Sequence, residues 1–214
     1  METSAITLVC FALPDEARSF RPLARGRPDV RILVTGMGRR NAEATIRAWF
    51  AQNRPALVLT CGFAGGLDPA LEHGAVVFEA ESGFALKDTW LAAGARPGRF
   101  HCTERVAVTP EEKRRLRETT SADAVEMESG AIRAVCHEHG VPAATVRVIS
   151  DTADEALPLD FNQLATPAGR MDFAKLAWAI ARAPGKISDL MRLRRRTRAA
   201  ADTLAGVLAR ITAA

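Results

Sequence analysis

Short apolar runs rich in β-branched residues alternate along the chain with stretches in which apolar residues recur at helical spacing. The apolar runs predict strands at Ile6–Leu13, Arg31–Thr35, Ala56–Cys61, Ala75–Phe78, Val106–Val108 and Ala143–Ile149. The amphipathic stretches predict helices at Asn41–Gln52, Pro110–Arg117 and Ser129–His139. Strands that alternate with helices in this way are typical of layered α/β proteins.

Three other segments differ from this pattern. The stretch Gly83–Gly98 has no clear periodicity, so we expect a loop or an excursion on the ligand side of the sheet there, and Pro158–Gly169 is expected to be an irregular connection. Further along, apolar residues spaced by three and four positions predict an amphipathic helix at about residues 187–212. The amino-acid pattern thus predicts α/β architecture followed by a long terminal helix.

The run Ala143–Ile149 ends abruptly at Ser150 and Asp151, as a parallel strand does where its carboxyl end reaches solvent. Ligands of open α/β sheets bind at such ends. The predicted helix Ser129–His139 leads into this strand and follows directly after Glu126 and Glu128. We therefore expect these carboxylates to meet in one cleft.

Three motifs carry a resemblance to a known family: Val125–Glu128 reads V-E-M-E, Ile149–Asp151 reads I-S-D, and Leu59–Leu67 reads L-T-C-G-F-A-G-G-L. They resemble signatures of the nucleoside phosphorylase and nucleosidase superfamily, the last of them its strand followed by a glycine-rich turn. The family includes purine nucleoside phosphorylases and methylthioadenosine/S-adenosylhomocysteine nucleosidases. The resemblance implies a single three-layer α/β/α domain over residues 1–214, with a central mixed, mostly parallel sheet.

Composition narrows the class of protein further. A chain of 214 residues with 48% hydrophobic residues suits one domain with a substantial aliphatic core. The start of the chain lacks the layout of a signal peptide, so we expect a cytoplasmic protein. The four cysteines and four histidines show no metal-ligand spacing, which predicts reduced thiols and no metal site.

The net charge of +4 is concentrated near the end of the chain. Residues 170–214 hold ten Lys and Arg against three Asp, so the remaining chain is slightly acidic. This distribution argues against nucleic acid as a partner. The basic terminal helix is expected to be a solvated face packed on the domain, with peripheral contact to an anionic membrane as the alternative.

Cleavage of an N-glycosidic bond needs a group that serves the departing purine. The resemblance gives Asp151 the task of protonating or hydrogen-bonding purine N7, with Ser150 to orient it. An acid at that position has to hold its proton near neutral pH, which partial burial beside apolar neighbours favours. The structural alternative for Asp151 is a helix N-cap.

The ribose needs a hydrogen-bond acceptor, and the resemblance gives this role to Glu128, with Met127 against the apolar face of the sugar. The alternative is that Glu126 and Glu128 only open a helix, where carboxylates interact favourably with the helix dipole. For Glu126 both interpretations can hold, and it is not expected to contact the substrate.

In the family's hydrolases a carboxylate after the first strand activates water. Alignment by eye selects Glu16, and the neighbouring Asp15 is the alternative because a shift of one residue exchanges the two. Both residues also suit the acidic first turn of a helix that begins with Pro14.

The glycine-rich block and one later segment are the remaining candidate binding residues. Ala64 and Gly65 allow a ligand to approach the backbone closely. Phe63 occupies the position where the family usually has Ser or Thr, and its ring is able to stack on a purine. Val106 lies in the segment that resembles the family's base-binding strand, although ordinary strand core explains it as well.

These features favour a nucleosidase that hydrolyses an adenosine-type purine nucleoside without a cofactor. One alternative is a phosphorylase with phosphate as co-substrate, held by Arg18, Arg21, Arg39 or the amides of Gly36–Arg39. Another is a nucleoside-binding protein without turnover, suggested by the hydroxyl that Phe63 replaces.

Two further expectations come from the family resemblance. Hydrolases of the superfamily usually form dimers, so a homodimer is expected. The basic terminus around Pro184–Lys186 resembles a bacterial branch associated with hopanoid synthesis, whose substrate joins adenosine to a lipid. Such a substrate is consistent with a membrane-facing basic helix and with the apolar Phe63.

Overall fold

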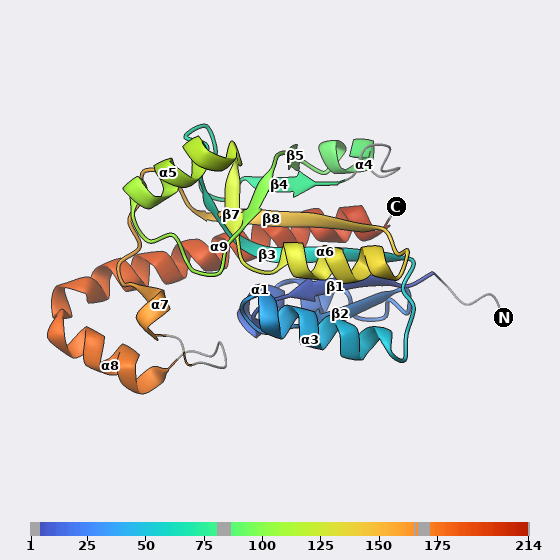
Figure 1. Cartoon of the computed structure of the whole chain (residues 1–214), viewed down its shortest axis with the longest axis horizontal. Helices are drawn as coiled ribbons and strands as arrows, with labels where there is room; N and C mark the ends of the chain where they lie inside the picture. Colours follow the sequence, from blue (N-terminus) through green and yellow to red (C-terminus); the bar gives the residue numbers. More distant parts are fainter. Residues whose placement is uncertain (1–4, 81–86, 165, 167–171, 214) are drawn as a thin grey trace.

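A computed structural model describes residues 5–80, 87–164, 166 and 172–213, and it has a mixed β-sheet between layers of helices (Figure 1). The strands are β1 (Thr7–Phe11), β2 (Val30–Val34), β3 (Leu57–Gly66), β4 (Val76–Glu79), β5 (Arg96–Pro97), β6 (Phe100–Cys102), β7 (Ala124–Glu126) and β8 (Ala143–Asp151). The main sheet has the order β2-β1-β3-β8-β4-β5. Its first four strands are parallel, and β4 is antiparallel to β8.

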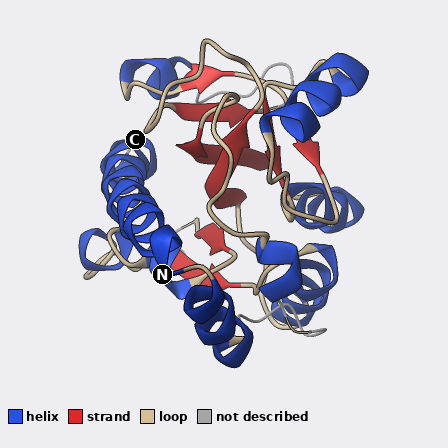
Figure 2. Ribbon diagram, turned by 90° about the vertical axis from the view of Figure 1, so that its left-hand side faces the viewer, coloured by secondary structure: helices blue, strands red, loops and turns tan. Residues whose placement is uncertain are grey.

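The helices cover both faces of this sheet, as the end view in Figure 2 also shows. They are α1 (Pro14–Ala17), α2 (Phe20–Leu23), α3 (Arg39–Phe50), α4 (Lys87–Ala92), α5 (Pro110–Thr120), α6 (Ser129–Glu138), α7 (Phe161–Leu164), α8 (Phe173–Arg182) and α9 (Ile187–Ala213), with a 3₁₀ turn, η1, at Pro184–Lys186. The predicted three-layer α/β/α fold with a mostly parallel sheet is confirmed.

Alternation along the central strands explains the two helical layers. Val9 belongs to the core that the sheet forms with α9, while the preceding Leu8 belongs to the core formed with α3 and α6. Successive side chains of a strand point to opposite faces, so a strand that is apolar at every position needs cover on both sides.

In the part of the chain that the structure describes, no helix is long and apolar enough to cross a membrane.

The small strand β7 connects this framework to the ligand side of the sheet. It pairs antiparallel with the end of β3 at Gly65 and Gly66, and β6 pairs with its other edge. The turn after β7 then starts α6, which leads into β8. This path carries the V-E-M-E and I-S-D motifs to the same end of the sheet.

Three sequence-based predictions about local structure were wrong. Val106–Val108 forms no strand, because Asn162 occupies both backbone groups of Val106 with bonds of 2.8 and 3.0 Å. The glycine-rich block does not follow β3 as a turn but forms its end, paired with β8 and β7. The stretch Gly83–Gly98 contains α4, whose Trp90 is fully buried against Phe78, and residues 83–86 lie outside the described residues.

The expected irregular connection Pro158–Gly169 was also wrong in part. It contains the short helix α7 at Phe161–Leu164, while residue 165 and residues 167–169 lie outside the described residues. The predicted terminal helix is present as α9, and its buried residues include Leu204 and Leu208.

Candidate active site

The nine residues predicted for the site all line one cavity of about 230 Å³. They are Glu16, Phe63, Ala64, Gly65, Val106, Met127, Glu128, Ser150 and Asp151. The cavity lies where β1, β3 and β8 end, and the loop around Val106 and part of α9 close its far side. Parallel strands that end at one edge therefore bring together residues that are up to 135 positions apart in the sequence.

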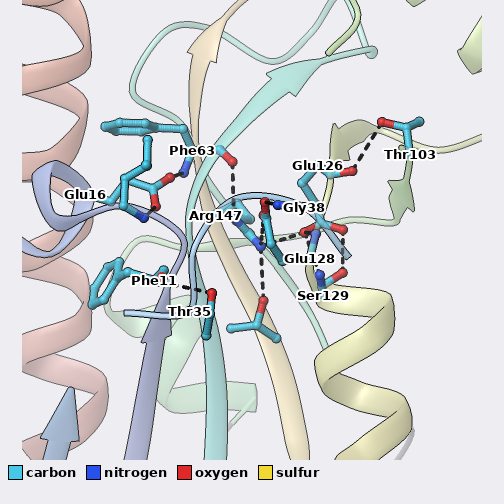
Figure 3. A network of polar contacts seen from close by, with 12 residues as sticks. Phe11, Glu16, Thr35, Gly38, Phe63, Thr103, Glu126, Glu128, Ser129 and Arg147 are labelled. Carbon is cyan, nitrogen blue, oxygen red and sulfur yellow. Dashed lines mark hydrogen bonds and ion pairs between the residues drawn. The ribbon is translucent and has the colours of Figure 1, made fainter. Parts of the chain in front are cut away.

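Glu16 is buried in the first turn after β1 and points back toward the sheet (Figure 3). Its Oε2 accepts a hydrogen bond from the Leu13 N–H at 2.9 Å, and Oε1 accepts one from the Phe63 N–H at 2.8 Å. Burial raises the pKa of this carboxyl to about 7, although Arg147 and the two backbone bonds oppose the rise. A carboxyl with this pKa is suited to take a proton from water near neutral pH.

Gly62 is what lets Glu16 reach this position. Its φ of +140° disfavours other residues, and a Cβ atom added there would lie 2.5 Å from Glu16 Oε1 and 2.9 Å from Arg147 Nη1. The glycine thus makes room for two protein side chains, whereas the sequence suggested that glycines of this block make room for a ligand.

Arg147 lies at the centre of a buried polar network that is drawn in Figure 3. Its Nη2 is 2.6 Å from Glu126 Oε2 and 3.2 Å from Glu128 Oε2, and it also donates to Thr60 Oγ1 at 3.2 Å. Burial opposes the charge of the guanidinium, but the surrounding carboxylates raise its pKa above the usual range. Arg147 therefore stays charged and holds the carboxylates in a fixed arrangement.

Sequence analysis missed Arg147, because the residue was included in a run interpreted as an apolar strand. One signal was available: a charged residue within such a run is buried only when it is paired. Glu126 and Glu128, the two glutamates of the V-E-M-E motif, supply that pairing.

The two glutamates of the V-E-M-E motif have different neighbours. Glu126 accepts the N–H groups of Glu128 and Ser129 at 3.0 and 2.8 Å, so it caps the start of α6 as the structural interpretation predicted. Burial acts to raise its pKa, but Arg147 and the bonds from Ser129 outweigh that effect and lower it. Glu126 is consequently an ionised partner for Arg147.

Glu128 is the second partner of Arg147 and belongs to the cavity wall together with Met127. Its Oε1 accepts the Gly38 N–H at 2.8 Å. Burial outweighs the attraction of Arg147 and raises the pKa of Glu128 above its usual value. The sequence suggested that the backbone amides of Gly36–Arg39 hold a phosphate. In the structure the amide of Gly38 instead bonds to the carboxylate of Glu128.

Asp151 ends β8 and is nearly buried, and its carboxylate contacts two polar side chains. Ser150 Oγ donates to Oδ1 at 2.7 Å, which agrees with the expected orienting contact. Lys113 Nζ lies 2.6 Å from Oδ2. The expectation of apolar neighbours around this carboxylate was wrong, because its two oxygens contact the Lys113 ammonium and the Ser150 hydroxyl. The N-cap alternative does not apply, since the next helix begins at Phe161.

Other residues considered from the sequence lie outside the cavity. Asp15, the alternative to Glu16, is not part of the wall, and neither are Arg18, Arg21 and Arg39. Arg105 and Arg147 are the cationic side chains among the described residues that line it.

Two comparisons of the sequence with known proteins give matches. The family model described as "Phosphorylase superfamily" matches residues 85–182. A 5′-methylthioadenosine/S-adenosylhomocysteine nucleosidase from Glaesserella parasuis serovar 5 is 29% identical over 170 residues, which cover 63% of this chain and 73% of that protein.

Solved structures share the fold over nearly the whole chain. Futalosine hydrolase from Helicobacter pylori has a TM-score of 0.75 at 16% identity and covers 100% of this chain and 99% of its own. The 5′-methylthioadenosine/S-adenosylhomocysteine nucleosidase from the same organism also gives 0.75, at 17% identity and 99% coverage of both chains. The match to the family model over residues 85–182 and the fold shared with these structures agree with the resemblance seen in the sequence motifs.

Proposed function

We propose that this protein is a nucleosidase that hydrolyses the N-glycosidic bond of an adenosine-type nucleoside and releases the free purine. The observation that carries the proposal is the convergence of Glu16, Glu128 and Asp151 on one cavity. The relatives named as nucleosidases, and the fold shared with futalosine hydrolase, support the same reaction class.

Each carboxylate has a distinct task in the proposed reaction. Water attacks C1′ of the ribose and loses a proton to Glu16, the buried carboxylate with a pKa of about 7. Glu128, held by Arg147 and the Gly38 amide, accepts hydrogen bonds from the ribose hydroxyls and stabilises positive charge on the sugar. The bond between C1′ and N9 breaks, and Asp151 donates a proton to N7 of the purine.

The charges around the cavity favour hydrolysis over phosphorolysis. A phosphate co-substrate needs cationic or amide donors that are not already engaged. Of the two cationic side chains among the described lining residues, Arg147 is paired with two carboxylates and Arg105 lies 3.5 Å from Glu112. The amide of Gly38, beside the lining residue Met37, is bonded to Glu128. Water needs no such anion site, so the arrangement suits a hydrolase.

Phe63 bears on the alternative of a binding protein without turnover. It lacks a side-chain hydroxyl, but its backbone N–H holds Glu16 in place at 2.8 Å. The position therefore still supports the group that would activate water, and this favours an enzyme over a binding protein.

The reaction is tested by incubating the protein with a panel of nucleosides and separating the products by chromatography. The panel is 5′-methylthioadenosine, S-adenosylhomocysteine, futalosine, adenosine, inosine and a 5′-alkylated adenosine, each with and without phosphate. We expect free adenine from at least one adenosine derivative at a rate independent of phosphate. A ribose 1-phosphate product would identify a phosphorylase, and binding without any base release would identify a binding protein.

The mechanism is tested with Asp151→Asn, which cannot give a proton to N7. Turnover should fall by on the order of 10²-fold or more, with a smaller effect on substrate binding. Unchanged turnover in a folded variant would remove Asp151 from the mechanism.

The predicted homodimer and membrane contact are further proposals with tests of their own. Light scattering after gel filtration measures the dimer. The basic stretch 191–198 of α9 and the exposed Trp178, Ile187 and Met191 support binding to an anionic surface. Sedimentation with anionic but not neutral vesicles would detect it, and cell fractionation tests the predicted cytoplasmic location.

A further inference from the structure

Lys113 is a buried cation next to the proposed site that the reaction described above does not use. It lies in the first turns of α5, and its side chain is 0% exposed. Its Nζ lies 2.6 Å from Asp151 Oδ2 and donates to the carbonyl oxygens of Thr152 at 2.6 Å and Glu155 at 2.9 Å. All three ammonium protons therefore have partners.

The position of this lysine in its helix is unusual. The sequence of α5 is almost entirely polar, and the residue it buries is Lys113. The helix starts with a capping box in which Thr109 and Glu112 bond each other's backbone, which fixes the turn that carries the lysine. Burying an ammonium costs several kcal/mol unless it is well paired, so an apolar residue would stabilise the fold more simply.

The contacts of Asp151 show what the lysine controls. Lys113 engages Oδ2 and Ser150 engages Oδ1, so the plane of the carboxylate is held from both sides. The two carbonyl bonds of Lys113 also attach the turn after β8 to α5. Lys113 thus contributes both to the orientation of Asp151 and to the shape of the backbone next to it.

We propose that Lys113 is the positioning residue for departure of the purine, an inference that rests on the proposed nucleosidase function. When the bond between C1′ and N9 breaks, the O–H bond of Asp151 breaks and an N7–H bond forms on the purine. Asp151 is left as a carboxylate beside the ammonium, which stabilises that charge. The proton taken from water by Glu16 returns through solvent to Asp151, so the turnover is balanced.

The proposal separates the two ends of the reaction. Glu16 acts on the attacking water and is needed for every leaving group. Lys113 and Asp151 are needed only when the leaving group requires a proton. A p-nitrophenyl riboside releases a stable phenolate anion, so it tests the first end without the second.

The experiment compares three variants of the full chain on a purine nucleoside and on p-nitrophenyl riboside. With the purine nucleoside, Lys113→Met should lower kcat by about 10- to 100-fold and change KM by less than about threefold, because misplaced catalytic groups act mainly on the chemical step. With the aryl riboside, Lys113→Met and Asp151→Asn should each change kcat by less than about threefold, while Glu16→Gln remains impaired.

Arg117→Met is the matched control. Arg117 lies one turn further along α5 and ties the helix to Asp68 and Asp123 at 2.9 Å, away from Asp151. The Arg117→Met variant removes both ion pairs from the same helix, so it reports a purely structural effect and should not distinguish the two substrates. Thermal denaturation of each variant shows whether it is folded, and Lys113→Arg, which keeps the charge, should recover part of the lost kcat.

The outcomes distinguish the inference from the function on which it rests. A wild-type protein that cleaves no nucleoside overturns the proposed function itself. A wild-type protein that cleaves nucleosides, with a Lys113→Met variant that is fully active or impaired equally on both substrates, overturns only the role of Lys113. If the wild-type protein does not accept the aryl riboside, the test is kcat on the purine nucleoside. A Lys113→Met variant that loses kcat, together with a Lys113→Arg variant that recovers none of it, refutes the inference.

Discussion

Replacing Glu16 with glutamine probes the group that we expect to activate water. Burial moves the pKa of this carboxyl from its usual value of 4.5 to about 7 in the folded protein. Each unit of that pKa difference corresponds to about 1.4 kcal/mol of unfolding free energy, so the whole change contributes roughly 3 kcal/mol. Glutamine does not titrate, and the variant should lose this contribution to the pH dependence of stability.

The sign follows from which form the fold prefers. The folded protein prefers the protonated carboxyl, so its contribution to stability is fully present below pH 4.5 and is lost as the pH rises through about 7. The difference in unfolding free energy between the wild-type protein and Glu16→Gln should therefore decrease by roughly 3 kcal/mol across that range. Urea denaturation at several pH values measures it, and subtraction of the variant removes the other titrating groups.

Activity should report the same ionisation. Glu16 accepts a proton only when it is ionised, so kcat/KM should fall about tenfold for each pH unit below the pKa. Glu16→Gln should lower kcat by about 10²- to 10⁴-fold and abolish this limb of the profile. The control is Asp15→Asn, because Asp15 is the neighbouring residue and lies outside the cavity. This variant should keep both the wild-type kcat and the acidic limb of the pH profile. A limb near pH 4.5, or wild-type turnover in Glu16→Gln, would refute the assignment.

Three more predictions test the framework of the site. Arg147→Met leaves Glu126 and Glu128 buried without their cation, so urea denaturation should show a loss of about 3–5 kcal/mol, and a loss below about 1 kcal/mol would contradict the buried network. Gly62→Ala forces a Cβ to within 2.5 Å of Glu16 and should cost about 1–3 kcal/mol, whereas Gly206→Ala in α9, with nothing within 4 Å, should stabilise the protein by about 0.5–1 kcal/mol. Glu128→Gln should lower kcat/KM by about 10- to 100-fold for a riboside but less for its 2′-deoxy analogue, since a bond to a charged acceptor is worth about 1.5–3 kcal/mol, and equal losses would argue against a contact with the 2′-hydroxyl.

Local pattern was sufficient for the long elements of this fold. β1, β8 and α6 bury continuous or periodic apolar residues, and they were predicted to within a few residues. Pattern was insufficient where tertiary contacts decide the structure. The segment at Val106 is apolar enough for a strand, but Asn162, which is 56 residues away, takes its hydrogen bonds.

The site divides in the same way. Glu16, Glu128 and Asp151 were found because they stand at element ends in segments that resemble those of a known family. Arg147 and Lys113 were missed, since each lies within an element and contacts carboxylates on other elements. No local spacing encodes such pairs.

The amino-acid sequence by itself determined the α/β layering, the acidic residues at strand ends and their order, because hydrophobic periodicity and motif chemistry act over a few neighbouring positions. Only the tertiary structure decided the electrostatics: which carboxylates are paired with Arg147 or Lys113, and why Glu16 has a pKa of about 7. Burial and charge pairing depend on distances between segments remote in the chain, and those distances exist only after the sheet has assembled.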